Sequence, residues 1–224
     1  MAHPRILLAL LLLGLAGCSS TVFETAPAGI ATDCDPAWPG RWQALPTGDE
    51  ASSPNGTLEI SADCRTATTS ERDPDTGGKR DKSEPLHVTL VDTGHGQYLQ
   101  VRDGDGKPDC IGKSETHCGY MLLRYEREGD TIRLYEADHA RVAAAIRKGS
   151  IRGHSQHHAG GQPGSAGTVD NFVAGDPARI ARVLRKHPEL FEDQPFGILQ
   201  RVAGQPDADS SVPAAEPPAQ QPEH

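Results

Sequence analysis

Cys18 has the clearest chemical setting of any reactive side chain in this sequence. It follows an apolar run at residues 6–13, and Arg5 places a positive charge directly before that run. This order is typical of a secretory signal, and the run is well short of the ~20 residues that a helix needs to cross a bilayer. Ala16 and Gly17, the two residues before the cysteine, are small. The sequence therefore predicts an exported protein with a thiol at the end of its signal.

The segment Leu15-Ala16-Gly17-Cys18 resembles the lipobox of bacterial lipoproteins. The resemblance implies that residues 1–17 are removed as a signal peptide, that the Cys18 sulfur receives a diacylglycerol, and that its new amino group is acylated, with palmitate as the attached chain. Several acyl chains together hold a protein firmly to a membrane. Ser19 stands where that family carries an aspartate for retention in the inner membrane. The resemblance therefore implies a lipid-anchored envelope protein, at the outer membrane and facing the periplasm.

Four cysteines remain once Cys18 carries lipid: Cys34, Cys64, Cys110 and Cys118. An even number in an oxidising compartment predicts two disulfides, which can be paired in three ways. Chain order favours Cys34–Cys64 and Cys110–Cys118, because each pair then closes a local loop. A zinc site made of all four is the alternative, but the chain has no Cys-x-x-Cys pair, which is the spacing typical of such sites.

Three histidines lie close together in the sequence, at His154, His157 and His158. Imidazoles bind zinc and copper. Their surroundings, residues 154–167, are rich in Gly and Ser and hold no carboxylate inside the cluster to orient the rings, and ordering a flexible loop around a metal costs conformational entropy. We therefore predict a solvated loop, with no metal and no cofactor, although metal binding by residues 154–158 stays an open alternative.

Residues 90–94, Leu-Val-Asp-Thr-Gly, resemble the catalytic loop of aspartic proteases, in which two aspartates share a proton. A single copy in the chain implies a homodimer. The string continues with His95 where that family carries a small residue, and we find no convincing second motif. The favoured interpretation is a hairpin turn, because Asp and Gly accept the backbone angles that turns need. The sequence therefore predicts no catalytic residues.

Strand patterns dominate the chain, and helical periodicity comes late. Strands are expected at 41–45, 57–60, 86–91, 98–101, 120–125, 131–135, 171–174 and 196–202. Helices are expected at about 138–148 and 177–187, the second with Asp176 as its cap and Pro177 at its first position. Polar loops are expected at 66–84, 103–118 and 154–167. The predicted fold class is α+β, a curved antiparallel sheet or small β-barrel with two short late helices.

The composition divides the chain into four parts. Residues 1–17 are the signal peptide, and the small and polar residues 18–32 are expected to form a lipidated tether. Residues 33–203 are expected to form a single globular α+β domain. Residues 204–224, rich in Pro, Ala, Gln and Asp, cannot bury a core and are expected to be a disordered tail.

Gly40-Arg41-Trp42, placed before a series of hairpins, resembles the Gly-x-Trp with which lipocalin chains begin. The resemblance implies an eight-stranded barrel that holds a small apolar ligand. The alternative is that Trp42 is a core residue closing one end of a sheet.

The net charge of the chain limits the classes of partner that it is expected to bind. Its net charge is −9, and removal of residues 1–17 takes away one base, Arg5, and no acid, which leaves −10. An acidic domain is repelled by phosphate, so nucleic acid is not an expected partner.

We expect an envelope-anchored lipoprotein with a non-catalytic structural or interaction role, whose partners are the membrane through its anchor and an envelope protein. A lipocalin-like carrier of a small apolar ligand is the alternative, and an enzyme or metal protein using the Asp92 or His154 regions is a third. An apolar cavity open at one end would favour the carrier, and a filled core would favour the first role.

Overall fold

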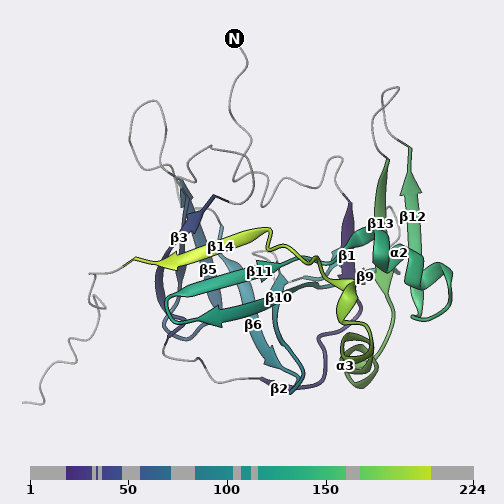
Figure 1. Ribbon diagram of the computed structural model, residues 1–224, viewed down its shortest axis with the longest axis horizontal. Helices are drawn as coiled ribbons and strands as arrows, with labels where there is room; N and C mark the ends of the chain where they lie inside the picture. The colour runs from purple at the N-terminus through teal and green to yellow at the C-terminus, as the bar shows by residue number, and fades with distance from the viewer. Residues whose placement is uncertain are drawn as a thin grey trace, which may run out of the picture.

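Two packed bodies, a barrel and a smaller lobe, make up the part of the chain that the structure describes (Figure 1). The structure is a computed structural model, and it describes residues 19–31, 34, 37–46, 56–71, 84–102, 107–111, 116–159 and 167–202. The barrel lies on the left of Figure 1, and the lobe on the right. The predicted tail and the ends of several polar loops lie outside the described residues.

Eight antiparallel strands close into the barrel. They are β3 (Gly40–Leu45), β4 (Gly56–Ile60), β5 (Thr66–Glu71), β6 (Leu86–Asp92), β7 (Gln97–Arg102), β10 (Met121–Glu128), β11 (Thr131–Tyr135) and β14 (Gly197–Arg201). Each pairs with the next in this order, and β14 pairs with β3 to complete the ring. Closure leaves the barrel without a free edge, apart from the short β2 (Ile30–Ala31) added beside β6. The predicted small β-barrel is confirmed.

Alternation along the strands gives the barrel wall two apolar faces. On β10, Leu123 and Tyr125 belong to the core inside the barrel, whereas Leu122 belongs to a second core outside it. On β7, Leu99 and Tyr98 divide in the same way. Successive side chains of a pleated strand point to opposite faces, as seen here. The outward-facing residues Leu122 and Tyr98 are buried because the lobe packs against this side of the barrel.

The lobe consists of residues inserted between β11 and β14, together with the first described segment of the chain. Its sheet has the order β1-β13-β12, from Ser20–Phe23, Thr168–Val173 and Gly153–His158, with β1 parallel to β13. The helices are α2 (His139–Arg147), α3 (Pro177–Lys186) and the 3-10 turn η2 (Pro188–Leu190). A small hairpin of β8 (Asp109–Cys110) and β9 (Cys118–Gly119) lies between the barrel strands β7 and β10 in sequence.

Both predicted helices are present, and the second begins after its predicted cap, Asp176. The Asp138 side chain accepts a hydrogen bond from the Arg141 backbone N–H, and Asp176 accepts one from Arg179. Pro177 occupies the first turn of α3, where a missing N–H costs nothing. Each helix buries its apolar stripe in the core between lobe and barrel, for example at Val142 and Ile180.

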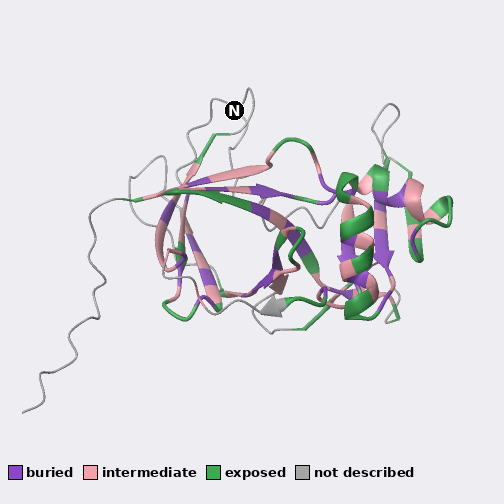
Figure 2. Ribbon diagram, turned by 60° about the horizontal axis from the view of Figure 1, so that its bottom comes forward, coloured by how far each residue is buried: buried purple, intermediate pink, exposed green. Residues whose placement is uncertain are grey.

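That shared core joins the two bodies. Phe23 of β1 and Phe191, after η2, stack with ring centroids 6.5 Å apart, and Tyr98 on the outside of the barrel meets Phe191 at 5.6 Å. Leu122 and Tyr135, also on the outer face of the barrel, belong to the same cluster. Figure 2 shows the barrel as a ring on the left and the lobe beside it, with buried residues on strands of both bodies.

Four segments predicted without regular structure contain strands, so those predictions are wrong there. The supposed tether contains β1, in which Val22 is buried and Phe23 has no exposed surface. The loops expected at 66–84, 103–118 and 154–167 contain β5, β8 and β12. β5 and β12 carry small or polar side chains, and β1 and β8 are short, so all four lack the longer run of large apolar residues by which strands are recognised.

The two disulfides are present, with the pairing that chain order favoured. Cys34 is joined to Cys64 in the turn between β4 and β5, and Cys110 of β8 is joined to Cys118 of β9. The hairpin that the second bond closes covers one face of the lobe sheet, because Ile111 packs with Val22 and Phe172.

Candidate functional site

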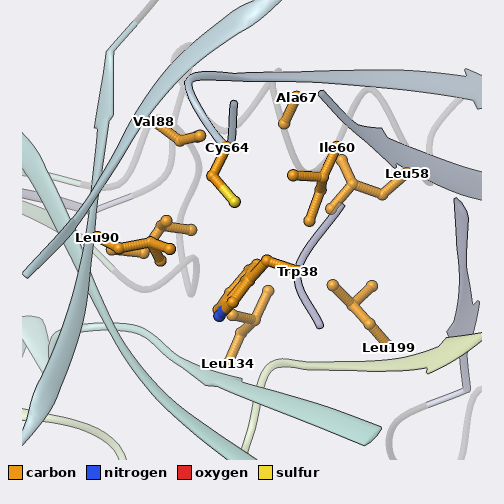
Figure 3. Close-up of a pocket in the computed structure, with 10 residues that line it drawn as sticks. Trp38, Leu58, Ile60, Cys64, Ala67, Val88, Leu90, Leu134 and Leu199 are labelled. Carbon is orange, nitrogen blue, oxygen red and sulfur yellow. The ribbon is translucent and has the colours of Figure 1, made fainter. Parts of the chain in front are cut away.

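The barrel interior is packed with apolar side chains and leaves a cavity of about 30 Å³ (Figure 3). Ligand pockets usually measure about 300–1,000 Å³, whereas about 10–15 Å³ is enough for one water molecule. The lining residues are Trp38, Leu58, Ile60, Cys64, Ala67, Val88, Leu90, Leu99, Leu134 and Leu199. As it stands, the cavity is too small for a lipocalin-type ligand.

Trp38 is the side chain that fills this space. In Figure 3 its ring lies among the aliphatic side chains that line the cavity, and it meets Tyr125 edge to face at 4.9 Å. Its carbonyl accepts a hydrogen bond from Trp42 Nε1 at 2.9 Å. Trp42 has no exposed surface, as expected of a core residue that closes one end of a sheet.

Arg201, on the last strand, holds the Trp38 segment in place from the same face of the barrel wall as Trp42, the residue opposite it on β3. Its guanidinium lies 4.5 Å over the Trp42 ring and donates to the carbonyls of Pro39, at 2.9 Å, and Ala37. The cation–π contact and two charge-assisted hydrogen bonds join the first and last strands of the barrel at one end. The Cys34–Cys64 bond also ties the residues before this segment to the turn after β4.

A second hollow, a cleft of about 460 Å³, lies in the lobe between α2 and the ends of β12 and β13. Ala140 and Ala143 of α2 leave room on one wall, and Arg147 from the next turn adds a positive charge. The remaining lining residues are His157, His158, Gly167, Thr168 and Val169. The cleft is mixed in polarity and within the size range of small-molecule sites.

A buried hydrogen-bond network beside this cleft ties α2 to the lobe sheet. Asn171 has no exposed surface, and its Nδ2 donates to Thr21 Oγ1 at 3.1 Å and to the His139 carbonyl at 3.0 Å. Its Oδ1 accepts from the Ser155 hydroxyl at 2.7 Å. Thr21 Oγ1 also lies 2.8 Å from His139 Nδ1. A satisfied network of this kind fixes the positions of three strands and a helix.

Burial lowers the pKa of the His139 imidazole below its ordinary value of 6.5, because removal from water penalises the charged form. The carboxylates of Asp138 and Asp170 act in the opposite direction but less strongly. His139 is therefore neutral at neutral pH. Its hydroxyl partner, Thr21, is only 5% exposed, so the pair lacks the access to substrate that a nucleophile needs.

On the opposite face of the lobe sheet, Asp170 joins the two outer strands. Its Oδ1 accepts from the Ser20 hydroxyl at 2.6 Å, and its Oδ2 lies 2.9 Å from His158 Nε2. A catalytic triad places the imidazole between hydroxyl and carboxylate, whereas here the carboxylate lies in the middle. In this trio the Ser20 hydroxyl therefore donates to a carboxylate and has no imidazole beside it, and the evident effect is to hold β1, β13 and β12 together.

The predicted histidine cluster lies on a strand, and its rings do not converge. Successive side chains on β12 point to opposite faces, so His157 is separated from His154 and His158, which are about 13 Å apart along the strand. His154 instead stacks on His117, with centroids 4.7 Å apart, beside Phe172. Among the described residues, no group of three or more His, Cys, Asp or Glu side chains could hold a metal ion.

The Asp92 motif forms the hairpin turn that was expected. The Asp92 carboxylate accepts a hydrogen bond from Gly94 N–H at 2.7 Å, and Thr93 N–H donates to the Gly96 carbonyl. Gly94 has a φ of +74°, which a residue without a side chain adopts easily. The Asp-Thr-Gly string is explained by turn formation between β6 and β7.

Cys18 lies outside the described residues, and Ser19, directly after it, is the first that the structure describes. Across the described ranges, we find no helix with the length and apolar character needed to cross a membrane. Comparison with models of known families, with curated proteins and with solved structures finds no match to this chain. The cleft was not predicted, because α2, β12 and β13 form it together and no local motif marks it. The Asn171 network was not predicted, because it joins β13 to Thr21, 150 positions away in the sequence.

Proposed function

We propose that this chain is an envelope-anchored lipoprotein, acylated at Cys18, whose domain has a structural or interaction role without catalysis. The proposed location is the outer membrane, facing the periplasm, with an envelope protein as partner. The observation that carries the non-catalytic part is the packed barrel, since a cavity of about 30 Å³ leaves no room inside the barrel for a substrate or a carried ligand.

Support for the anchor comes from the sequence. Residues 15–18 match a lipobox, and the apolar run before them is too short to span a bilayer. The two disulfides are typical of proteins that fold outside the cytoplasm. The net charge of −9 favours a protein partner over nucleic acid.

A lipocalin-like carrier is the second candidate. The closed barrel of eight antiparallel strands and the buried Trp42 of Gly40-Arg41-Trp42 favour this fold, and the cavity lining is apolar. The volume opposes it, because Trp38 occupies the space that a ligand would need. Carriage would require Trp38 to move aside.

One experiment tests both candidates. The full chain is produced in a Gram-negative bacterium, and the protein is fractionated and weighed intact by native mass spectrometry. We expect the parent protein in the membrane fraction with the added mass of acyl chains, and Cys18→Ser in the soluble fraction with both disulfides intact. Ser19→Ala serves as the matched control and should remain in the membrane.

The same spectra separate the outcomes. A Cys18→Ser protein that still pellets with membranes would mean that Cys18 is not the anchor. A small apolar molecule that co-purifies in stoichiometric amount would favour the carrier over the non-catalytic structural role.

A further inference from the structure

The folded lobe begins immediately after the proposed anchor. Ser19 Oγ accepts a hydrogen bond from the Val169 N–H at 3.0 Å, and Ser20 is the first residue of β1. Cys18 is one peptide unit before Ser19, so their Cα atoms are about 3.8 Å apart. A Cys18 whose acyl chains lie in a bilayer would therefore hold Ser19, and the strands bonded to it, at the level of the lipid head groups.

Strand register identifies which residues share this end of the lobe. Ser20 of β1 is opposite Asp170 of the parallel strand β13, so both strands begin together. β12 runs the other way, and its last residues, His157 and His158, pair with Val169 and Thr168. The start of β1 and the end of β12 lie at the same end of the sheet, at the top right of Figure 1.

The 460 Å³ cleft is at this end, and its charge is positive in an acidic protein. Arg147 and His157 line it, and both side chains are exposed. Asp170, which follows the lining residue Val169 in the sequence, has its side chain on the other face of the sheet, where Ser20 and His158 contact its two oxygens. Residues 160–166, which join β12 to β13 in the sequence, contain no charged side chain. Arginine attracts the phosphate groups of lipids within about one Debye length, roughly 10 Å, and the N–H of an imidazole can donate a hydrogen bond to a phosphate oxygen.

We propose that this end of the lobe is a membrane-contacting surface, with Arg147 and His157 placed against the phosphate groups of phospholipids in the bilayer that holds Cys18. The inference rests on the proposed acylation of Cys18. It adds to that proposal the orientation of the folded domain on the membrane. The lobe lies on the membrane, and α2 presents Ala140 and Arg147, which are both exposed, to the head groups.

The opposite end of β12 supplies a matched control position. Arg152, just before the first residue of β12, is exposed and cationic like Arg147. It is five residues from His157 along an extended chain, or about 17 Å. A bilayer that contacts His157 through this surface would leave Arg152 in water.

The test uses the full acylated chain with the photo-crosslinking residue p-benzoylphenylalanine at His157 or, in a second protein, at Arg152. Each is reconstituted into vesicles of phosphatidylethanolamine and phosphatidylglycerol, irradiated, and weighed for covalent lipid adducts. We expect several-fold more lipid adduct at position 157 than at 152. Adding Arg147→Glu should reduce the adduct at 157, whereas Arg182→Glu, on an exposed position of α3, should not.

Sedimentation of the vesicles before irradiation separates the two proposals. Protein that sediments with the vesicles but forms equal adducts at both positions, or more at 152, overturns the orientation and leaves the anchor standing. Protein that carries no acyl chain and stays in the supernatant overturns both. Intact masses that show two disulfides in every variant exclude misfolding as the cause of a low adduct yield.

Discussion

Trp38 is the single residue that decides what the barrel can hold. Its ring fills the interior, meets Tyr125 edge to face, and leaves about 30 Å³ of free space. Three further contacts keep it there, because Trp42 donates to its carbonyl and Arg201 donates to the carbonyls of both neighbours, Ala37 and Pro39. The barrel is therefore closed by its own side chain, and a ligand would have to replace that side chain.

We expect Trp38→Ala to lower the free energy of unfolding by about 3–5 kcal/mol, since the change removes a buried aromatic ring and leaves a cavity. Urea unfolding followed by circular dichroism measures the loss. Trp38→Phe keeps most of the ring and is the matched control, with an expected loss well under half as large.

Added indole should partly restore the Trp38→Ala protein, because the new cavity has the shape of the missing ring and apolar cavities bind molecules that fill them. The measurement is the midpoint of thermal unfolding with and without indole. The parent protein should not respond. An equal rise of the unfolding temperature in both proteins would contradict the conclusion that the Trp38 ring fills the barrel interior.

At the scale of elements, alternation and capping were sufficient to predict most of the barrel and both helices. β6, β7, β10 and β11 carry large apolar residues at every second position, helical periodicity indicates the first helix, and Asp176 marks the start of the second. β1, β5 and β12 were missed because their stability comes from partners rather than from their own composition. Ser20, for example, bonds to Asp170, which is 150 positions away in the sequence.

The candidate sites divide in the same way. The cysteine pairs could be predicted because each closes a short stretch of chain, and Asp92 because turns are local. The cleft could not, since its walls come from α2, β12 and β13. The histidines were misplaced because a Gly-, His- and Ser-rich stretch lacks the apolar alternation by which strands are recognised.

The two disulfides should contribute unequally to stability. Their cysteines are 30 and 8 positions apart in the sequence. In the chain-entropy description, the longer closed loop restricts the unfolded chain more, which gives about 3.6 kcal/mol for Cys34–Cys64 and about 2.5 kcal/mol for Cys110–Cys118.

The double variants Cys34→Ala/Cys64→Ala and Cys110→Ala/Cys118→Ala test this by urea unfolding of the periplasmic proteins. We expect the first to lose more stability than the second. A larger loss for the second pair would mean that the β8–β9 hairpin stabilises the lobe by covering Val22 and Phe172, beyond any effect on the unfolded chain.

For the whole molecule, the shared core makes barrel and lobe one folding unit. Phe23, Phe191 and Val142 of the lobe lie in one cluster with Tyr98, Leu122 and Tyr135 of the barrel. The chain also crosses between the bodies several times, because β1 precedes the barrel and the rest of the lobe is inserted before β14. Neither body is a single continuous stretch of the chain, and each buries part of its apolar surface against the other. We therefore expect the barrel and the lobe to unfold together.

Two natural probes can test this cooperativity separately in each body. Both tryptophans of the chain, at 38 and 42, are in the barrel core, whereas α2 and α3, the helices that the structure describes, are in the lobe. Tryptophan fluorescence therefore reports the barrel, and the helical circular-dichroism signal at 222 nm is weighted toward the lobe. We expect the two urea unfolding curves to coincide, as they do for a two-state protein.

Phe23→Ala should separate the curves, because it removes a ring with no exposed surface from the junction and leaves the barrel interior unchanged. The loss of a buried Phe costs about 3–5 kcal/mol of stability. Here that loss weakens the packing between the lobe and the barrel. The circular-dichroism midpoint should therefore move to lower urea than the fluorescence midpoint. Leu45→Ala, at an exposed position on β3, is the control and should move neither. Curves that already differ in the parent protein would show that the lobe unfolds by itself, and that the junction is weaker than its burial indicates.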